Sequence, residues 1–181
     1  MPGDHVFGYA SLLNDMRRRG EELSRLRGYR RSWNVASDNR LTLPGYKLYL
    51  DPRSGERPEV FVTFLNLVPD EQCSVAGILF PVSAQALELL DLRERNYQRH
   101  DVTAELEDRV DGRVWCYFGT AEAEARCREG RETGRAVVNG GYYERVQAGF
   151  AACGADALAE FEASTDAPGC PIVELERVEI E

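Results

Sequence analysis

Two short segments, far apart in the sequence, contain the residue types best suited to chemistry. The first, residues 6–13, reads VFGYASLL, in which a strand-like run passes through a glycine into a turn. Backbone N–H groups in such a turn can bind an anion. The second, residues 89–97, reads LLDLRERNY and ends a helical pattern with one carboxylate, Glu94, close to a tyrosine. An anion-binding loop together with a single carboxylate suits an enzyme that recognises a small polar substrate and moves one proton.

The remaining residues offer little material for other catalytic chemistries. The chain contains two histidines, His5 and His100, which are too few for a histidine-rich metal site. A Ser-His-Asp triad has no more support, and no cluster of carboxylates at a strand end indicates a magnesium site. We therefore expect neither a metal ion nor a cofactor.

The cysteine pattern indicates free thiols. The number of cysteines is odd, and no two have the C-x-x-C spacing that is typical of zinc sites. A disulfide framework is therefore not indicated, and reduced thiols are typical of an intracellular compartment. The five residues are Cys73, Cys116, Cys127, Cys153 and Cys170.

Composition and charge favour one soluble domain that spans residues 1–181. The hydrophobic fraction of 43% and the charged fraction of 29% are ordinary for a globular protein. The formal net charge of −9 argues against nucleic-acid binding, which needs a basic surface. The start of the chain lacks a signal-peptide pattern, and the longest clean apolar run, residues 75–82, is too short to span a bilayer. We expect a cytoplasmic protein without nucleic-acid or membrane partners, either a monomer or a homodimer.

Hydrophobic alternation predicts the strands and the helix that must position the two segments. A short buried strand leads into the glycine turn, and Ser83 is a good N-cap for a helix that ends near residues 94–96. Residues 69–72 predict a hairpin-like connection between the two best strand candidates. The expected strands cover residues 5–9, 28–35, 60–67, 73–81, 97–105 and 112–118, with an imperfect final strand over 171–180.

Turn residues and charge runs predict the other segments. Pro44-Gly45 predicts a turn, and two helices, over 142–150 and 155–163, are expected on either side of Gly154. Because the connections between strands are short, we predict an α+β fold with mostly antiparallel strands. The polar segments are residues 14–27, with too few apolar positions for a helix, 51–58, a loop, and 122–135, a loop or a weakly packed helix.

Several motifs together resemble the γ-glutamylcyclotransferase-like proteins. Residues 7–12, FGYASL, resemble the YGSL-type substrate loop of that family. Residues 77–80, GILF, followed by a helix that ends in LRE and then by Tyr97, are similar to its catalytic segment. Residues 142–149, YYERVQAG, are similar to its Y-L-x-x-I-x-x-G helix. The order and spacing of these motifs extend the resemblance over residues 5–162.

The resemblance implies a fold, a reaction and a set of site residues. The fold would be a small mixed, mostly antiparallel β-barrel flanked by helices, and the reaction would release 5-oxoproline from a small-molecule γ-glutamyl amide. Glu94 would be the acid/base, and a loop of four residues would hold the substrate α-carboxylate through backbone N–H groups. The implied substrate-binding residues are Tyr9, Ala10, Ser11 and Leu12 in that loop, with Tyr117 and Tyr142 lining the pocket.

The chemistry of the implied reaction explains why these residue types suffice. A γ-glutamyl amide carries its own nucleophile, the α-amine, which can form a five-membered ring by attacking the γ-carbonyl. The amine is mostly protonated near neutral pH, so a carboxylate can take its proton and later return it to the departing amine. This reaction requires neither a metal ion nor a cofactor.

One departure from the family pattern leaves alternatives open. The family has glycine where this chain has Ala10, which would be strained at positive φ but would only narrow the pocket at negative φ. That substitution keeps open a non-catalytic small-molecule binding or interaction module on the same fold. A third alternative is an amide hydrolase or transferase that uses Cys116, the cysteine beside Tyr117.

The arginine-rich segment of residues 17–31 and the leaving group also remain open. The arginines form either a solvated face or a contact for an acidic partner or for the acidic C-terminus of the chain. Alternatively, Arg30, Arg31 or a neighbour meets an anionic part of the substrate beyond the glutamyl unit. The leaving group depends on which substrate is used: glutathione, a γ-glutamyl amino acid, a γ-glutamylamine, or a biosynthetic intermediate that carries a γ-glutamyl protecting group.

Overall fold

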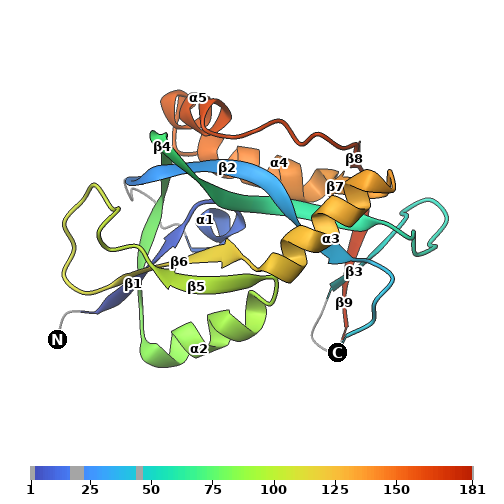
Figure 1. The fold of residues 1–181 in the computed structure, drawn as a ribbon, viewed down its shortest axis with the longest axis horizontal. Coiled ribbons are helices and arrows are strands. Elements are labelled where there is room, and N and C mark those ends of the chain that lie inside the picture. The colour runs from blue at the N-terminus through green and yellow to red at the C-terminus, as the bar shows by residue number, and fades with distance from the viewer. Residues whose placement is uncertain (1–2, 17–22, 44–46, 181) are drawn as a thin grey trace.

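A mixed β-sheet forms the centre of the protein (Figure 1). The computed structural model describes residues 3–16, 23–43 and 47–180. Within these residues, seven strands form one sheet in the order β5-β6-β1-β4-β7-β8, with β2 also paired to β4. The strands are β1 (Asp4–Gly8), β2 (Ser24–Asp38), β4 (Phe61–Val82), β5 (Tyr97–Asp101), β6 (Val114–Gly119), β7 (Ala136–Asn139) and β8 (Ile172–Val173).

The strand pairings are mostly antiparallel. Both β1 and β2 run antiparallel to β4, and β5 runs antiparallel to β6. Shorter parallel pairings join β1 to β6 and β4 to β7. A second, two-stranded antiparallel sheet pairs β3 (Lys47–Leu50) with β9 (Glu176–Glu179). This arrangement confirms the predicted α+β class, whereas closure of the sheet into a barrel stays a prediction.

The hairpin predicted at residues 69–72 is wrong. This polar segment does not reverse the chain but lies within β4, a strand of 22 residues that is antiparallel to β2 on both sides of it. The register shifts at Gly28 (φ +83°), so that residues 70–73 lie opposite this one residue. A bulge of this kind bends a strand and tolerates residues such as Pro69 that cannot complete the ladder. The polar composition therefore marks a largely exposed bulge.

Local capping signals fix where the helices begin. The Ser83 hydroxyl accepts a hydrogen bond of 3.2 Å from the Ala86 N–H, as predicted, and the Asn139 side chain accepts one of 2.9 Å from the Gly141 N–H. Gly154, at φ +123°, separates the last two helices, which confirms the predicted pair. The helices are α1 (Ser11–Met16), α2 (Ala84–Arg93), α3 (Ala121–Glu132), α4 (Gly140–Ala151) and α5 (Ala155–Ala163).

Two other segments differ from the prediction, whereas the segment 122–135 is helical as far as residue 132, one of the two forms predicted for it. Residues 14–16 are helical because α1 continues into the polar stretch, and α3 is a regular helix whose first turn is capped by the Thr120 hydroxyl. The expected final strand is divided, because the chain leaves β7 after residue 173 and then pairs with β3 as β9. The turn predicted at Pro44-Gly45 lies outside the described residues.

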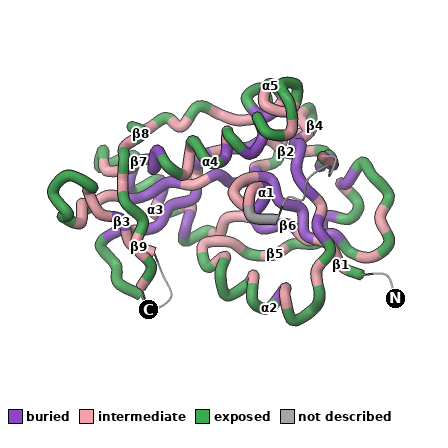
Figure 2. Tube along the Cα trace, turned by 180° about the vertical axis from the view of Figure 1, so that it is seen from behind, coloured by how far each residue is buried: buried purple, intermediate pink, exposed green. Residues whose placement is uncertain are grey.

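The main apolar core is formed by side chains of β1, β2, β4 and β6 together with residues of α1, α2, α4 and α5. Figure 2 shows the buried stretches of the chain in purple. Phe7 of β1 and Phe150 of α4 are fully buried, and Phe150 stacks on Phe161 of α5 with ring centroids 4.5 Å apart. Helix α2 lies on the opposite side of the sheet from α4 and α5 (Figure 1). No helix in the described ranges is long and apolar enough to cross a membrane.

Gly77 of β4 permits the close approach of β4 to β1. A Cβ atom at this position would lie 2.5 Å from Cζ of Phe7 and 2.8 Å from the carbonyl oxygen of Gly8. We therefore expect Gly77→Ala to lower the free energy of unfolding by about 1–3 kcal/mol, because the backbone of β1 must move. Chemical denaturation measures this loss. Gly3→Ala is the control, since nothing lies within 4 Å of its Cβ position, and equal stability of the two variants would contradict the expectation.

Candidate functional site

One cavity of about 340 Å³ brings together all the residues predicted for the site. Its wall contains the loop after β1, the C-terminal end of α2, a residue of β6, the start of α4, and parts of β3 and β9. Segments far apart in the sequence therefore meet here, although the roles of the individual residues stay predictions. The predicted residues in the wall are Tyr9, Ala10, Ser11, Leu12, Glu94, Tyr117 and Tyr142.

The loop after β1 turns tightly into α1. Gly8 is needed for close packing, because a Cβ atom there would lie 3.1 Å from Cβ of Leu12 and 3.3 Å from Cγ2 of Ile78. The N–H of Leu13 donates to the carbonyl oxygen of Ala10 at 3.1 Å, which closes the first turn. N–H groups in the first turn of a helix have no intrahelical acceptors, so this loop can offer donors to an anion in the cavity.

Ala10 adopts an unstrained conformation in this loop. Glycines alone have positive φ among the described residues, so Ala10 has negative φ. Its methyl group therefore narrows the cavity without straining the backbone. Backbone strain at Ala10 therefore does not support a non-catalytic module, which otherwise stays an untested alternative.

Arg31 holds the loop from behind and does not line the cavity. Its side chain is fully buried, and Nε donates to the carbonyl oxygen of Tyr9 at 2.8 Å. One terminal nitrogen donates to Oγ of Ser164 at 2.7 Å, and the other donates to the carbonyl oxygen of Ala76. The prediction that Arg31 meets the substrate is therefore wrong, because its donors are used by the loop, β4 and the end of α5.

Aromatic rings complete the surroundings of the buried guanidinium. The Cζ atom of Arg31 lies 4.8 Å from the ring centroid of Phe150 and 5.1 Å from that of Phe161. Burial lowers the pKa of Arg31 to about 9, so the guanidinium stays charged at neutral pH. Cation–π attraction and hydrogen bonds to neutral acceptors thus replace the hydration of this charge.

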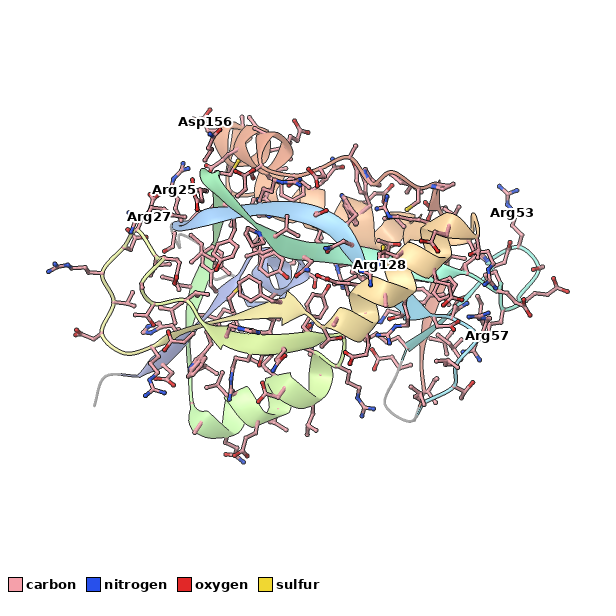
Figure 3. All side chains as sticks on the ribbon, in the orientation of Figure 1. Arg25, Arg27, Arg53, Arg57, Arg128 and Asp156 are labelled. Atoms are coloured by element: carbon pink, nitrogen blue, oxygen red, sulfur yellow. The ribbon has the colours of Figure 1, made fainter. Side chains whose placement is uncertain are left out.

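The other arginines of the N-terminal segment also lie outside the cavity wall. Arg25 forms a bidentate pair with the Glu160 carboxylate at 2.5 and 2.7 Å, and Arg30 pairs with Asp166. Figure 3 shows Arg25 at the end of β2 that is remote from β3 and β9. The prediction that Arg30 meets the substrate is therefore wrong as well, and residues 17–19 lie outside the described residues.

Glu94 is the only carboxylate among the described residues of the cavity wall. It caps the C-terminal end of α2, and its N–H donates to the carbonyl oxygen of Leu90 at 2.8 Å. Its side chain is 18% exposed, and Oε1 lies 3.4 Å from Nε of Arg93. A largely shielded carboxylate that reaches a cavity is suited to proton transfer.

Four tyrosines line the cavity together with this carboxylate. Burial is the largest cause that raises the pKa of Tyr9, Tyr97, Tyr117 and Tyr142 above the usual 10, and the negative charge of Glu94 raises each of them further. The four hydroxyls therefore stay protonated at neutral pH and can orient a polar substrate as neutral hydrogen-bonding groups.

Hydrogen bonds fix three of these tyrosines. The Tyr9 hydroxyl donates to the carbonyl oxygen of Tyr117 at 2.8 Å, and the Tyr117 hydroxyl donates to Oδ1 of Asp91 at 2.8 Å. The Tyr97 hydroxyl donates to the carbonyl oxygen of Leu65 at 2.7 Å. Asp91 lies one turn before the end of α2, so these bonds tie the loop, β6 and α2 into one rigid wall.

Sequence reasoning missed several residues of the wall. Tyr97 belongs to the helix-end motif, but the motif predicts no role for it in the site. Its N–H donates to the carbonyl oxygen of Glu94 at 2.8 Å. The basic residues Lys47, Arg145 and Arg177 also line the cavity. No local signal indicated Lys47 or Arg177, because only the long-range pairing of β3 with β9 brings them to the site.

Among the residues that the structure describes, no cysteine lines this cavity. Cys116 is fully buried and is not part of the wall, and burial raises the pKa of its thiol. A buried protonated thiol is a poor nucleophile, so the Cys116 hypothesis is wrong. Within the described ranges, no group of three or more His, Cys, Asp or Glu side chains is placed to hold a metal ion.

The burial of Cys116 predicts resistance to alkylation. Treatment of the native protein with iodoacetamide is expected to leave Cys116 unmodified, because neither the reagent nor hydroxide reaches the thiol. Peptide mass spectrometry measures the modification, with urea-denatured protein as the positive control. Rapid modification of Cys116 in the native protein would contradict its burial.

The contacts of Arg31 predict a large stability effect. Arg31→Met leaves three buried acceptors without their donor, each at a cost of about 1–3 kcal/mol, so the free energy of unfolding is expected to fall by about 3 kcal/mol or more. Arg30→Met is the matched control: its side chain is 37% exposed, and its ion pair is worth about 1 kcal/mol or less. Urea denaturation compares the two variants, and equal losses would refute a structural role for the buried guanidinium.

Comparisons with known proteins agree with this geometry. A family model for γ-glutamyl cyclotransferase, AIG2-like, matches residues 6–147, whereas curated proteins gave no match. A solved γ-glutamyl cyclotransferase has a TM-score of 0.52 and 11% identity, over 90% of this chain and 88% of that chain. A γ-glutamyl cyclotransferase specific to glutathione from yeast has a TM-score of 0.47 and 16% identity, also over 90% and 88%. At 11% identity, the first of these structures shows a similarity of fold alone. The family match spans most of the sequence, and the chain therefore belongs to the γ-glutamyl cyclotransferase, AIG2-like family.

Proposed function

We propose that this protein is a cyclotransferase that releases 5-oxoproline from a small-molecule γ-glutamyl amide, with Glu94 as general acid/base. The observation that carries the proposal is the presence of Glu94, the one carboxylate of the described wall, in the same cavity as the loop of residues 9–12. Membership of the family supports the reaction class.

The proposed reaction begins with binding of the glutamyl unit. Backbone N–H groups of the loop after β1 bind the α-carboxylate, and Glu94 takes a proton from the α-ammonium group. The freed amine attacks the γ-carbonyl carbon, and a new C–N bond closes the five-membered ring. Glu94 then returns this proton to the amide nitrogen as the original C–N bond breaks, and the attacking nitrogen loses its second proton to the departing amine. The products are therefore 5-oxoproline and the amine in its ammonium form.

Positioning accounts for much of the expected rate enhancement. Well-oriented intramolecular reactions reach effective molarities of about 10⁵ M or more, so the site must hold the glutamyl chain in a folded conformation. We assign this role to the tyrosines of the cavity wall, with Tyr117 and Tyr142 contacting the glutamyl chain. Tyr142 is itself held by edge-to-face contacts with Phe64 (5.2 Å) and Trp33 (6.0 Å).

A single substitution tests the role of the carboxylate. Glu94→Gln is expected to reduce 5-oxoproline release by about 10²-fold or more, because the amide cannot accept the ammonium proton. Chromatographic measurement of 5-oxoproline with a panel of γ-glutamyl amides gives the rate, and the thermal transition is expected to stay unchanged.

Glu88→Gln provides the matched control. Glu88 is an exposed residue of the same helix and is not part of the cavity wall, so its substitution is expected to leave the rate unchanged. Retained turnover in Glu94→Gln would eliminate the assignment of this residue. A wild-type protein that binds these amides without forming product would eliminate the reaction itself.

A further inference from the structure

Basic side chains gather on the part of the cavity wall formed by β3, β9 and α4. Lys47, Arg145 and Arg177 come from these three elements and all line the cavity, in a protein whose formal net charge is −9. Strand β9 lies beyond the residues matched by the family model, which end at 147. We propose that these three residues form an anion subsite that binds a carboxylate on the leaving amine of the substrate, so that the protein selects γ-glutamyl amides of amino acids over those of neutral or cationic amines.

The pairing of β3 with β9 places two of these residues on one face. Tyr49 lies directly opposite Arg177, and Lys47 lies opposite Glu179. Directly opposed residues, and residues two apart on one strand, point to the same side of a sheet. Because Lys47, Tyr49 and Arg177 all line the cavity, this face of the two-stranded sheet is turned towards the substrate.

The electrostatics of Lys47 indicate an excess of positive charge. Burial is the largest cause that lowers the pKa of Lys47, and the positive charges of Arg177 and Arg93 lower it further. The carboxylates of Glu94 and Glu179 act in the opposite direction without reversing the shift. Lys47 is thus a partly buried cation close to other cations. A bound anion would stabilise its charged form.

Arg145 reaches the same region from α4. The positive charges of Arg177 and Arg145 both act to lower the pKa of Tyr49, against burial, which raises it. The two guanidinium groups therefore lie near one buried ring. Arg177 also pairs with Glu179, whereas among the described residues no ion pair involves the side chain of Lys47 or Arg145. These two cations are available for a charge-assisted hydrogen bond to a substrate anion.

The position of this subsite relative to the reacting atoms assigns it to the leaving group. The inference rests on the proposed function, in which the loop after β1 binds the glutamyl α-carboxylate and Glu94 moves the proton. The wall formed by β3, β9 and α4 is then left for the amine side of the scissile bond. A cationic leaving amine would be repelled there, which adds discrimination to the attraction for an anion.

Two substrates that differ by one carboxylate provide the test. γ-Glutamylalanine and γ-glutamylethylamide share the glutamyl unit and the two-carbon amine skeleton. We expect the wild-type protein to prefer γ-glutamylalanine in kcat/KM by about tenfold or more, as for a hydrogen bond to a charged group. Lys47→Met, Arg145→Met and Arg177→Met are each expected to move this ratio towards one, mainly through KM, whereas Lys47→Arg is expected to retain it.

Arg53→Met is the matched control, because Arg53 projects outward from the loop between β3 and β4 (Figure 3) and is not part of the wall. It is expected to leave the ratio unchanged. A wild-type ratio near one, or variants that weaken both substrates equally, would overturn the subsite while the proposed reaction stands. If the variants lower kcat/KM for both amides equally, the three cations bind the glutamyl unit that the two substrates share.

Calorimetry on the Glu94→Gln variant measures the affinity for each of the two amides without turnover. It therefore tests the subsite independently of the proposed reaction. A tighter affinity for γ-glutamylalanine that is lost in Lys47→Met would support the subsite even if no product forms. Absence of binding by both compounds would overturn the subsite and the proposed function together.

Discussion

A buried guanidinium constrains the arrangement of the whole site. Arg31 lies in the interior, and among the described residues its hydrogen bonds go to uncharged acceptors on three separate segments: the loop after β1, strand β4 and the end of α5. Removing such a charge from water is costly unless every donor finds an acceptor. The three segments must therefore hold their relative positions, which fixes the loop of residues 9–12 against the core.

The same constraint explains how a short loop can be rigid. The carbonyl oxygen of Tyr9 is held from behind by Arg31, and its hydroxyl is held by the backbone of β6. Helix α2 is tied to β6 through the bond between Tyr117 and Asp91. Preorganisation of this kind reduces the conformational entropy that a ligand would otherwise lose on binding. Loop and carboxylate thus belong to one connected framework.

The sequence predicted those parts of the site that depend on residues close together in the chain. The Ser83 cap, the end of α2 at Glu94 and the glycine before α5 each depend on neighbours within a few residues, and the sequence was sufficient for them. The burial of Arg31 and the bulge of β4 opposite Gly28 depend on strands that meet across the fold. Lys47 and Arg177 show the same limit, because their shared face exists only once β3 pairs with β9.

That pairing also sets the order in which the site can form during synthesis. Lys47 and Glu179 are register partners, although most of the chain separates them. A nascent chain that has emerged through residue 147 already contains the loop, Glu94 and the whole family-matched region, yet it still lacks the strand that completes the wall. The part of the cavity wall that contains β9 can therefore form only after the loop after β1 and Glu94 have been synthesised.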